Sequence, residues 1–377
     1  MTATVVPDLS PSFAPLRLGS GHRLANRWGV APLTNQQSHS DGTLSEEELR
    51  WLAMRGAGGF GLTMTCAAHV MAAGQGFPGQ LGIWGDQHLP GLRRLAAALR
   101  AGGTLGLVQL HHAGLRAPAA LTGRRPLGPS DDASTGAVAL TLAEVVDVRD
   151  AFIAAAVRAQ QAGFDGVELH GAHGYLLCSF LSPGENRRSD AYGGSLEARW
   201  RLLFEILDGV RAACGTGFLV AVRISPERFG LDVREQLALF AALDARGDVD
   251  LIDVSMWDVF KRPEDPAFAD VDLLTAYTAL RRRHSRLAVA GKIATPAEVA
   301  AVLAAGADVA LLGRGAILHH DFPRRAAVEA TFCPRSLPVP ATVLADEGLS
   351  PTFIDYMRRW KGFVAEAEPS LDDEERR

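Results

Sequence analysis

Short apolar segments rich in β-branched residues alternate along the chain with longer segments rich in Ala, Leu, Arg and Glu. The short segments are typical of buried strands and the longer ones of helices. We predict eight strands, near residues 27–33, 60–66, 104–110, 166–170, 218–225, 250–256, 286–293 and 308–313. Helices are predicted near residues 45–57, 90–101, 142–162, 196–213, 234–245, 271–284 and 296–305. This alternation indicates parallel strands joined by helical crossovers.

Eight such units close naturally into a barrel, so the predicted fold class is α/β, a (β/α)8 TIM barrel. An open, doubly wound sheet is the structural alternative. A Rossmann site in such a sheet needs a GxGxxG sequence after its first strand. Residues 34–38, Thr-Asn-Gln-Gln-Ser, hold no glycine. We therefore expect residues 1–377 to form a single domain, with the barrel at about 15–333 and an extension at about 334–377.

Three segments depart from the bare alternation. Residues 16–24 are expected to form an N-terminal hairpin that closes the barrel floor. Residues 112–140, after the third strand, form a long Pro- and Gly-rich loop, and such loops in compact domains are usually lids or caps. The C-terminal extension is expected to carry a helix near residues 351–366 and to end in a charged, disordered tail at 372–377.

Composition narrows the classes of function. The formal net charge of −5 argues against a broad basic surface for nucleic acid. The four cysteines form no CxxC pair, which gives no sign of a zinc ribbon or an iron–sulfur cluster. The N-terminal residues lack the features of a signal peptide, and no apolar run reaches membrane-spanning length. A cytoplasmic protein that binds no membrane is therefore expected.

The active site of a barrel enzyme lies at the C-terminal ends of its strands. Polar residues end most of the predicted strands here: Thr34, Gln109, His170, Arg223, Lys292 and Arg314. The densest group follows the fourth strand, where His170, His173 and Tyr175 are predicted to form the catalytic centre. Two histidines can donate to one substrate oxygen and stabilise its developing negative charge. A tyrosine can supply a proton as general acid.

Other interpretations of this cluster stay open at the level of sequence. His170 and His173 with Glu168 could be a metal site, although no second carboxylate or cysteine cluster stands nearby. The two histidines could also be buried and satisfied in a polar loop. Arg223 fits the electron-rich edge of a flavin ring, or equally a salt bridge to an acidic strand residue such as Glu168.

Glycine beside a cation ends each of the last two strands, at Gly291-Lys292 and Gly313-Arg314. Many barrels bind phosphate at this place, through backbone N–H groups and basic side chains. The alternative is a pair of turns with basic side chains facing solvent. Together with the polar strand ends, the pattern favours a phosphate-bearing cofactor or substrate. FMN has the shape that these sites require, with a phosphate at one rim of the barrel and an electron-accepting ring across its mouth.

At these residues the chain resembles the old yellow enzyme family of NAD(P)H:flavin oxidoreductases, or ene-reductases. Residues 170–176, His-Gly-Ala-His-Gly-Tyr-Leu, and residues 180–195, Phe-Leu-Ser-Pro-Gly-Glu-Asn-Arg-Arg-Ser-Asp-Ala-Tyr-Gly-Gly-Ser, match its HGAHGYL…FLSPxxNxRxDxYGGS signature. Residues 31–34, 108–114, 221–223, 289–292 and 312–314 match further family segments in order. The resemblance extends over about residues 15–327, essentially the whole barrel.

The resemblance implies a tightly but non-covalently bound FMN. Its expected contacts are Ala31, Pro32, Leu33, Thr34, Ala67, Gln109, Arg223, Gly291, Lys292, Gly313 and Arg314. Substrate is expected to meet His170, His173, Tyr175, Gln36 and Trp257, and no metal is expected. One branch of the family has Cys at the position of Thr34 and a tyrosine at that of Gln36, so this chain departs from that branch.

The implied reaction has two halves. NADH or NADPH reduces FMN, which then reduces the C=C bond of an activated alkene (an enone, enal, maleimide or nitroalkene) with Tyr175 as proton donor. Relatives form monomers, dimers or larger assemblies, so a homo-oligomer is among the expected states. The alternatives are a dienoyl-CoA or amine dehydrogenase relative, a flavoprotein without turnover, and a metal-dependent barrel hydrolase.

Overall fold

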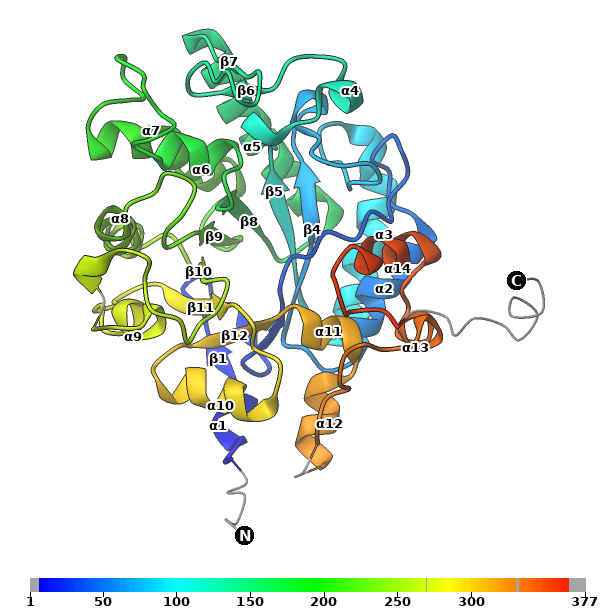
Figure 1. Ribbon diagram of the computed structural model, residues 1–377. Coiled ribbons are helices and arrows are strands. Elements are labelled where there is room, and N and C mark those ends of the chain that lie inside the picture. Colours follow the sequence, from blue (N-terminus) through cyan, green and yellow to red (C-terminus); the bar gives the residue numbers. More distant parts are fainter. Residues whose placement is uncertain (1–6, 269, 330–331, 366–377) are drawn as a thin grey trace, which may run out of the picture.

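Eight parallel strands form one closed barrel in the computed structural model, which describes residues 7–268, 270–329 and 332–365 (Figure 1). The barrel strands are β3 (Trp28–Val30), β4 (Leu62–His69), β5 (Leu105–His111), β8 (Gly166–Gly171), β9 (Leu219–Ile224), β10 (Leu251–Ser255), β11 (Arg286–Ala290) and β12 (Val309–Leu312). They follow one another around the barrel in sequence order, and β12 pairs with β3 to close it. The predicted fold and all eight predicted strands are confirmed.

Helices surround the barrel in Figure 1. Those that connect successive strands are α2 (Glu46–Ala57), α3 (Leu89–Gly102), α5 (Leu142–Ala162), α7 (Leu196–Cys214), α8 (Val233–Arg246), α9 (Leu273–Thr278) and α10 (Pro296–Ala304). Their ends follow from local sequence. The side chains of Thr141 and Glu144 form a capping box at the start of α5, and Gly163 ends that helix in a left-handed conformation.

The inside of the barrel is layered because side chains alternate across each strand. Leu62, Leu107, Leu219, Leu251 and Val309 belong to its buried apolar cluster. The next inward positions along β5, β9 and β10 carry Gln109, Ala221 and Asp253, and Arg223 follows Ala221 on β9. Apolar residues therefore fill the lower barrel, and polar groups gather toward the C-terminal ends of the strands.

The predicted floor hairpin is present as β1 (Leu16–Arg17) paired antiparallel with β2 (Arg23–Leu24). Its residues Leu16, Leu18 and Leu24 are buried in the same apolar cluster as the lower barrel leucines. The hairpin thus closes the end of the barrel opposite the polar groups.

The long loop after β5 carries α4 (Ala119–Thr122) and a small separate sheet of β6 (Leu127–Gly128) and β7 (Val138–Ala139). After β12 the chain continues through α11 (Arg314–Leu318) and α12 (Phe322–Val328) to α13 (Ala341–Asp346) and α14 (Pro351–Arg358). In Figure 1, α13 and α14 lie beside α2 and α11. No helix of the described residues is long and apolar enough to cross a membrane.

Two predicted helices are shorter in the structure. The helix expected at 271–284 spans only Leu273–Thr278. Beyond it the Asp244 carboxylate accepts the backbone N–H groups of Arg283, His284 and Ser285, which holds this segment in a non-helical path before β11. The helix expected at 351–366 ends at Arg358. The predicted tail at 372–377 lies outside the described residues.

Candidate active site

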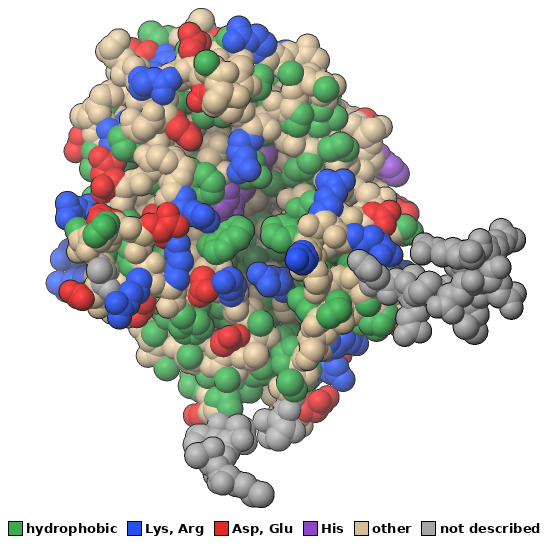
Figure 2. All heavy atoms as spheres, viewed as in Figure 1, with side chains coloured by type: hydrophobic (Ala, Val, Ile, Leu, Met, Phe, Trp, Pro, Cys, Tyr) green, Lys and Arg blue, Asp and Glu red, His purple; other side chains and the backbone are tan. Residues whose placement is uncertain are grey.

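A cavity of about 610 Å³ opens at the C-terminal ends of the barrel strands. Figure 2 shows this face hollowed between hydrophobic side chains, with histidine visible inside and Lys and Arg side chains around the hollow. All residues predicted to contact the cofactor line the cavity: Ala31, Pro32, Leu33, Thr34, Ala67, Gln109, Arg223, Gly291, Lys292, Gly313 and Arg314. The loops after different strands have therefore brought these distant positions together.

The predicted substrate side also lies in this cavity, with one exception. His170, His173, Tyr175 and Trp257 line it. Gln36 does not belong to the lining, and its backbone carbonyl packs against Gly79. The loop that leaves β3 therefore contributes Thr34 to the cavity, whereas Gln36 two residues later does not reach it.

His170, His173 and Tyr175 form an aromatic cluster. The His170 ring centre lies 5.0 Å from that of His173 and 5.0 Å from that of Tyr175, with each pair edge to face. His111, at the end of β5, packs against two of these rings, with its centre 4.4 Å from that of Tyr175 and 5.4 Å from that of His170. His173 has a positive φ of 63°, which lets its side chain turn back over the strand end.

Both cavity histidines are held neutral. Burial, His173, His111 and Arg223 all lower the pKa of His170 well below its usual range. Burial, then Arg223 and Arg116, lower the pKa of His173 to about 3. A neutral imidazole has one donor and one acceptor nitrogen, so each ring can still offer one N–H to a substrate oxygen.

Three buried ionisable residues, Arg223, Asp253 and Glu168, lie on neighbouring strands next to this cluster; we call them the buried charged group. Arg223 is 5% exposed, and its Nε lies 3.1 Å from Oδ2 of the fully buried Asp253. Glu168 is also fully buried and accepts a 2.7 Å hydrogen bond from Nε2 of Gln109. Burial and the Asp253 charge raise the pKa of Glu168 to about 8, so this carboxyl is protonated at neutral pH.

This group answers the question that the sequence left open for Arg223. The arginine makes an ion pair, but with Asp253 on the neighbouring strand, and it lines the cavity as well. Glu168 bonds to Gln109 rather than joining the two histidines. Within the part of the chain that the structure describes, no three His, Cys, Asp or Glu side chains are arranged to hold a metal ion.

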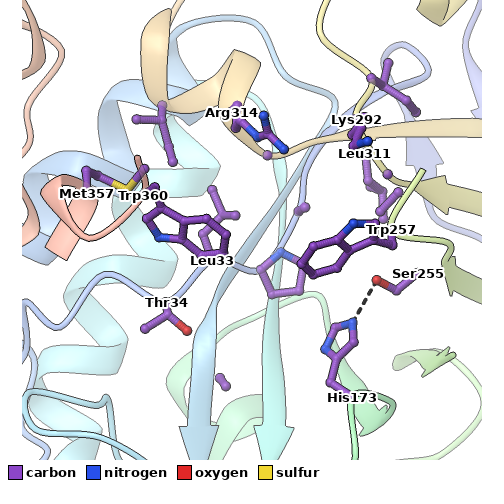
Figure 3. A pocket seen from close by; sticks show the side chains of 18 of the residues that line it. Leu33, Thr34, His173, Ser255, Trp257, Lys292, Leu311, Arg314, Met357 and Trp360 are labelled. Carbon is purple, nitrogen blue, oxygen red and sulfur yellow. Dashed lines mark hydrogen bonds between the residues drawn. The ribbon is translucent and has the colours of Figure 1, made fainter. Parts of the chain in front are cut away.

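The opposite side of the cavity carries cations. Figure 3 shows Arg314 and Lys292 on the side away from His173 and Ser255. Lys292 Nζ lies 3.0 Å from Asp258 Oδ2, whereas the Arg314 guanidinium has no partner among residues 7–268, 270–329 and 332–365. Arg314 is thus available for an anionic group such as a phosphate.

One cavity residue is placed by a backbone irregularity. The pairing of β4 with β5 runs from Met64 opposite Leu107 to Ala67 opposite Gln109, so β4 has one extra residue at this point. A β-bulge of this kind re-aims the side chains that follow it. The bulge brings the small Ala67 to the cavity wall beside Gln109, which the weak sequence match at this position left uncertain.

Sequence reasoning missed several residues of the cavity lining, among them a serine at a strand end and a C-terminal segment. Ser255, the last residue of β10, lines it and lies within hydrogen-bond distance of His173. The C-terminal segment supplies Tyr356, Met357, Trp360, Lys361 and Phe363 as a further wall. Tyr356, Trp360 and Phe363 recur at spacings of four and three residues, and such apolar spacing was the available signal for this wall.

Comparisons with known proteins agree with this geometry. The sequence profile of the NADH:flavin oxidoreductase / NADH oxidase family matches residues 11–330. The probable NADH-dependent flavin oxidoreductase YqiG of Bacillus subtilis (strain 168) is 37% identical over 321 residues, which are 82% of this chain and 85% of that protein.

Two solved structures share the fold. The old yellow enzyme homologue from Zymomonas mobilis is 28% identical with a TM-score of 0.77, covering 92% of this chain and 99% of its own. Morphinone reductase in complex with tetrahydroNAD is 28% identical with a TM-score of 0.74, covering 88% and 93%.

The family match spans most of the chain, and the cavity brings the family's signature residues together on a closed barrel. The chain therefore belongs to the NADH:flavin oxidoreductase / NADH oxidase family, the old yellow enzyme family, and is an oxidoreductase whose cofactor is FMN and whose electron donor is NADH or NADPH.

Proposed function

We propose that this enzyme reduces the C=C bond of an activated alkene (an enone, enal, maleimide or nitroalkene), with His170 and His173 binding the electron-withdrawing group and Tyr175 donating the proton. The observation that carries the proposal is the convergence of two neutral histidines and one tyrosine in a single cavity above Arg223. Two N–H donors on one oxygen polarise the conjugated system and stabilise negative charge on that oxygen.

The cavity fits FMN. Thr34 Oγ1 and the amide oxygen of Gln109 make no hydrogen bond to the described part of the chain, although Gln109 is buried. These groups and Arg223 would hold the polar edge of the flavin ring, and Arg314 would hold the phosphate. When bound, FMN supplies a hydride acceptor for NAD(P)H and a hydride donor for the alkene.

Tyr175 suits the role of proton donor. It lines the cavity, and burial raises the pKa of its phenol above the ordinary value. The phenol therefore keeps its proton at neutral pH until a carbon with developing negative charge takes it. The Tyr175 ring packs edge to face against that of His170, so a substrate whose oxygen binds to His170 would lie close to the phenol.

The decisive experiment follows the flavin spectrum. The purified protein, loaded with FMN, is reduced anaerobically with NADPH or NADH, and cyclohex-2-enone is then added. We expect the oxidised flavin band to disappear and return, with the saturated ketone formed in equal amount. Reduction by the nicotinamide without reoxidation by enone, maleimide or nitroalkene would overturn the proposal and favour a flavoprotein that does not turn over alkenes.

A further inference from the structure

Ser255 lies between the cavity histidine His173 and the buried Arg223. Its Oγ is 2.8 Å from His173 Nε2, the contact drawn as a dashed line in Figure 3. The same oxygen is 3.2 Å from Nη2 of Arg223, which donates to it. Arg223 is itself anchored by Asp253 through its Nε. One hydroxyl thus joins the buried charged group to the substrate side of the cavity.

Either partner could donate in the Ser255–His173 hydrogen bond, since a hydroxyl both donates and accepts and the ring can carry its proton on either nitrogen. A guanidinium only donates, so Ser255 Oγ accepts from Arg223 and its own O–H remains to be placed. A neutral imidazole has one bare nitrogen, which accepts such a proton. When Nε2 of His173 accepts, the ring proton must sit on Nδ1, the nitrogen turned away from Ser255.

In His170 the proton is placed on the opposite ring nitrogen, Nε2. Its Nδ1 accepts the backbone N–H of Ala172 at 3.3 Å, so its proton sits on Nε2. In each histidine one ring nitrogen, Nδ1 of His170 and Nε2 of His173, then accepts a hydrogen bond from the protein, and the other nitrogen carries the proton. A substrate oxygen between the rings would receive an Nε2–H from His170 and an Nδ1–H from His173.

We propose that Ser255 is a positioning residue: held by Arg223, it donates to His173 Nε2 and fixes His173 in the tautomer whose Nδ1–H faces the cavity. The inference rests on the proposed role of His170 and His173 in binding the substrate oxygen. It adds that the buried Asp253–Arg223 pair controls this role through Ser255. Without Ser255 the ring would also populate the other tautomer, whose bare Nδ1 repels a substrate oxygen.

The test uses the FMN-loaded enzyme with ¹⁵N-labelled histidine, whose ring nitrogen shifts report the tautomer directly. The spectrum of a His173→Gln variant assigns the His173 signals. We expect the Nδ1–H form of His173 in the wild type, loss of its dominance in Ser255→Ala, and its return in Ser255→Thr. A wild-type His173 that carries its proton on Nε2 would overturn the proposal even if neither Ser255 variant folds.

Ser225→Ala is the matched control, since Ser225 Oγ accepts the backbone N–H of the same His173 at 3.0 Å without touching its ring. The control should keep the Nδ1–H form. A second readout is binding of p-hydroxybenzaldehyde, followed by the long-wavelength band that phenolates produce with oxidised flavin. Ser255→Ala should weaken this binding by about fivefold, the effect of one lost hydrogen bond, and Ser255→Thr should restore it.

The two readouts separate this inference from the proposed function. If His173→Gln binds the phenol as tightly as the wild type, the proposed oxygen-binding role of His173 is wrong, whatever its tautomer. If His173→Gln weakens binding but Ser255→Ala changes neither tautomer nor affinity, the role of His173 stands and that of Ser255 is wrong.

Discussion

The guanidinium of Arg116 lies over the face of the Tyr175 ring, with 5.3 Å between its central carbon and the ring centre. The two residues come from loops after different strands, β5 and β8. Arg116 also donates a 2.7 Å hydrogen bond from Nη1 to the backbone carbonyl of His173. A cation over the ring stabilises the phenolate that forms when Tyr175 gives up its proton, and Arg116 accordingly opposes the rise in the pKa of Tyr175 caused by burial.

Arg116→Ala should therefore slow alkene reduction by about twofold to fivefold, because an exposed cation–π contact contributes about 0.5–1 kcal/mol. Flavin reduction by NAD(P)H, measured separately by stopped-flow absorbance, should keep its rate. Arg116→Lys retains the charge and serves as the matched variant, with most of the rate preserved. Equal losses in both half-reactions would show that Arg116 acts on the fold of the loop rather than on Tyr175.

Tyr175→Phe should leave flavin reduction by NAD(P)H nearly intact and slow reoxidation by cyclohex-2-enone by about a hundredfold, the scale of a lost general acid. Phenol binding should persist, since His170 and His173 remain. Rapid mixing of the reduced enzyme with enone measures the effect. If both half-reactions slow to the same extent, Tyr175 is not the specific proton donor.

Glu168→Gln should alter the pH dependence of stability. Burial and Asp253 raise the pKa of Glu168 from 4.5 to about 8, so between these values the folded protein holds a proton that the unfolded chain has released. The free energy of unfolding of the wild type should then fall as pH rises through this window, by up to about 1.4 kcal/mol per pH unit.

A glutamine cannot ionise, so the variant should lose this part of the slope. Urea unfolding of the FMN-loaded wild type and variant at several pH values between 5 and 8 checks the difference. Parallel slopes for the two proteins would mean that Glu168 is ionised throughout the window.

Trp360→Ala should speed the loss of FMN. Trp360 follows α14, is 47% exposed and lies in the cavity beside Leu33 and Met357 (Figure 3). Removal of the half-buried Trp360 side chain should weaken FMN binding by roughly 1 kcal/mol, or about fivefold. Recovery of flavin fluorescence after dilution gives the rate. Trp84→Ala is the control, since Trp84 is 38% exposed and stands outside the cavity lining; an equal effect in both variants would contradict the role of Trp360.

Much of the fold could be predicted from the sequence because buried strands and helices differ in the spacing of their apolar residues. The alternation of short apolar and longer helical segments predicted all eight barrel strands. Parallel barrel strands end on the same face, so polar residues at strand ends such as Gln109, Arg223 and Arg314 could be assigned to one site before any contact was known. Helix ends were less predictable: α9 ends at Thr278, and the residues after it, expected to be helical, bond instead to Asp244, which is distant in sequence.

The sequence by itself thus determined the barrel, the family and the strand-end residues of the cavity, but neither the exclusion of Gln36 nor the presence of Ser255. Only the tertiary structure decided the contacts that set their chemistry. Ser255 bonds to His173 across 82 positions of sequence, Arg116 covers Tyr175, and Trp360 returns from the C-terminal segment to the cavity wall. Periodicity specifies which face of an element is buried, but not which residue of another loop it will meet. Those pairings depend on barrel closure and on loop paths, which no local pattern encodes.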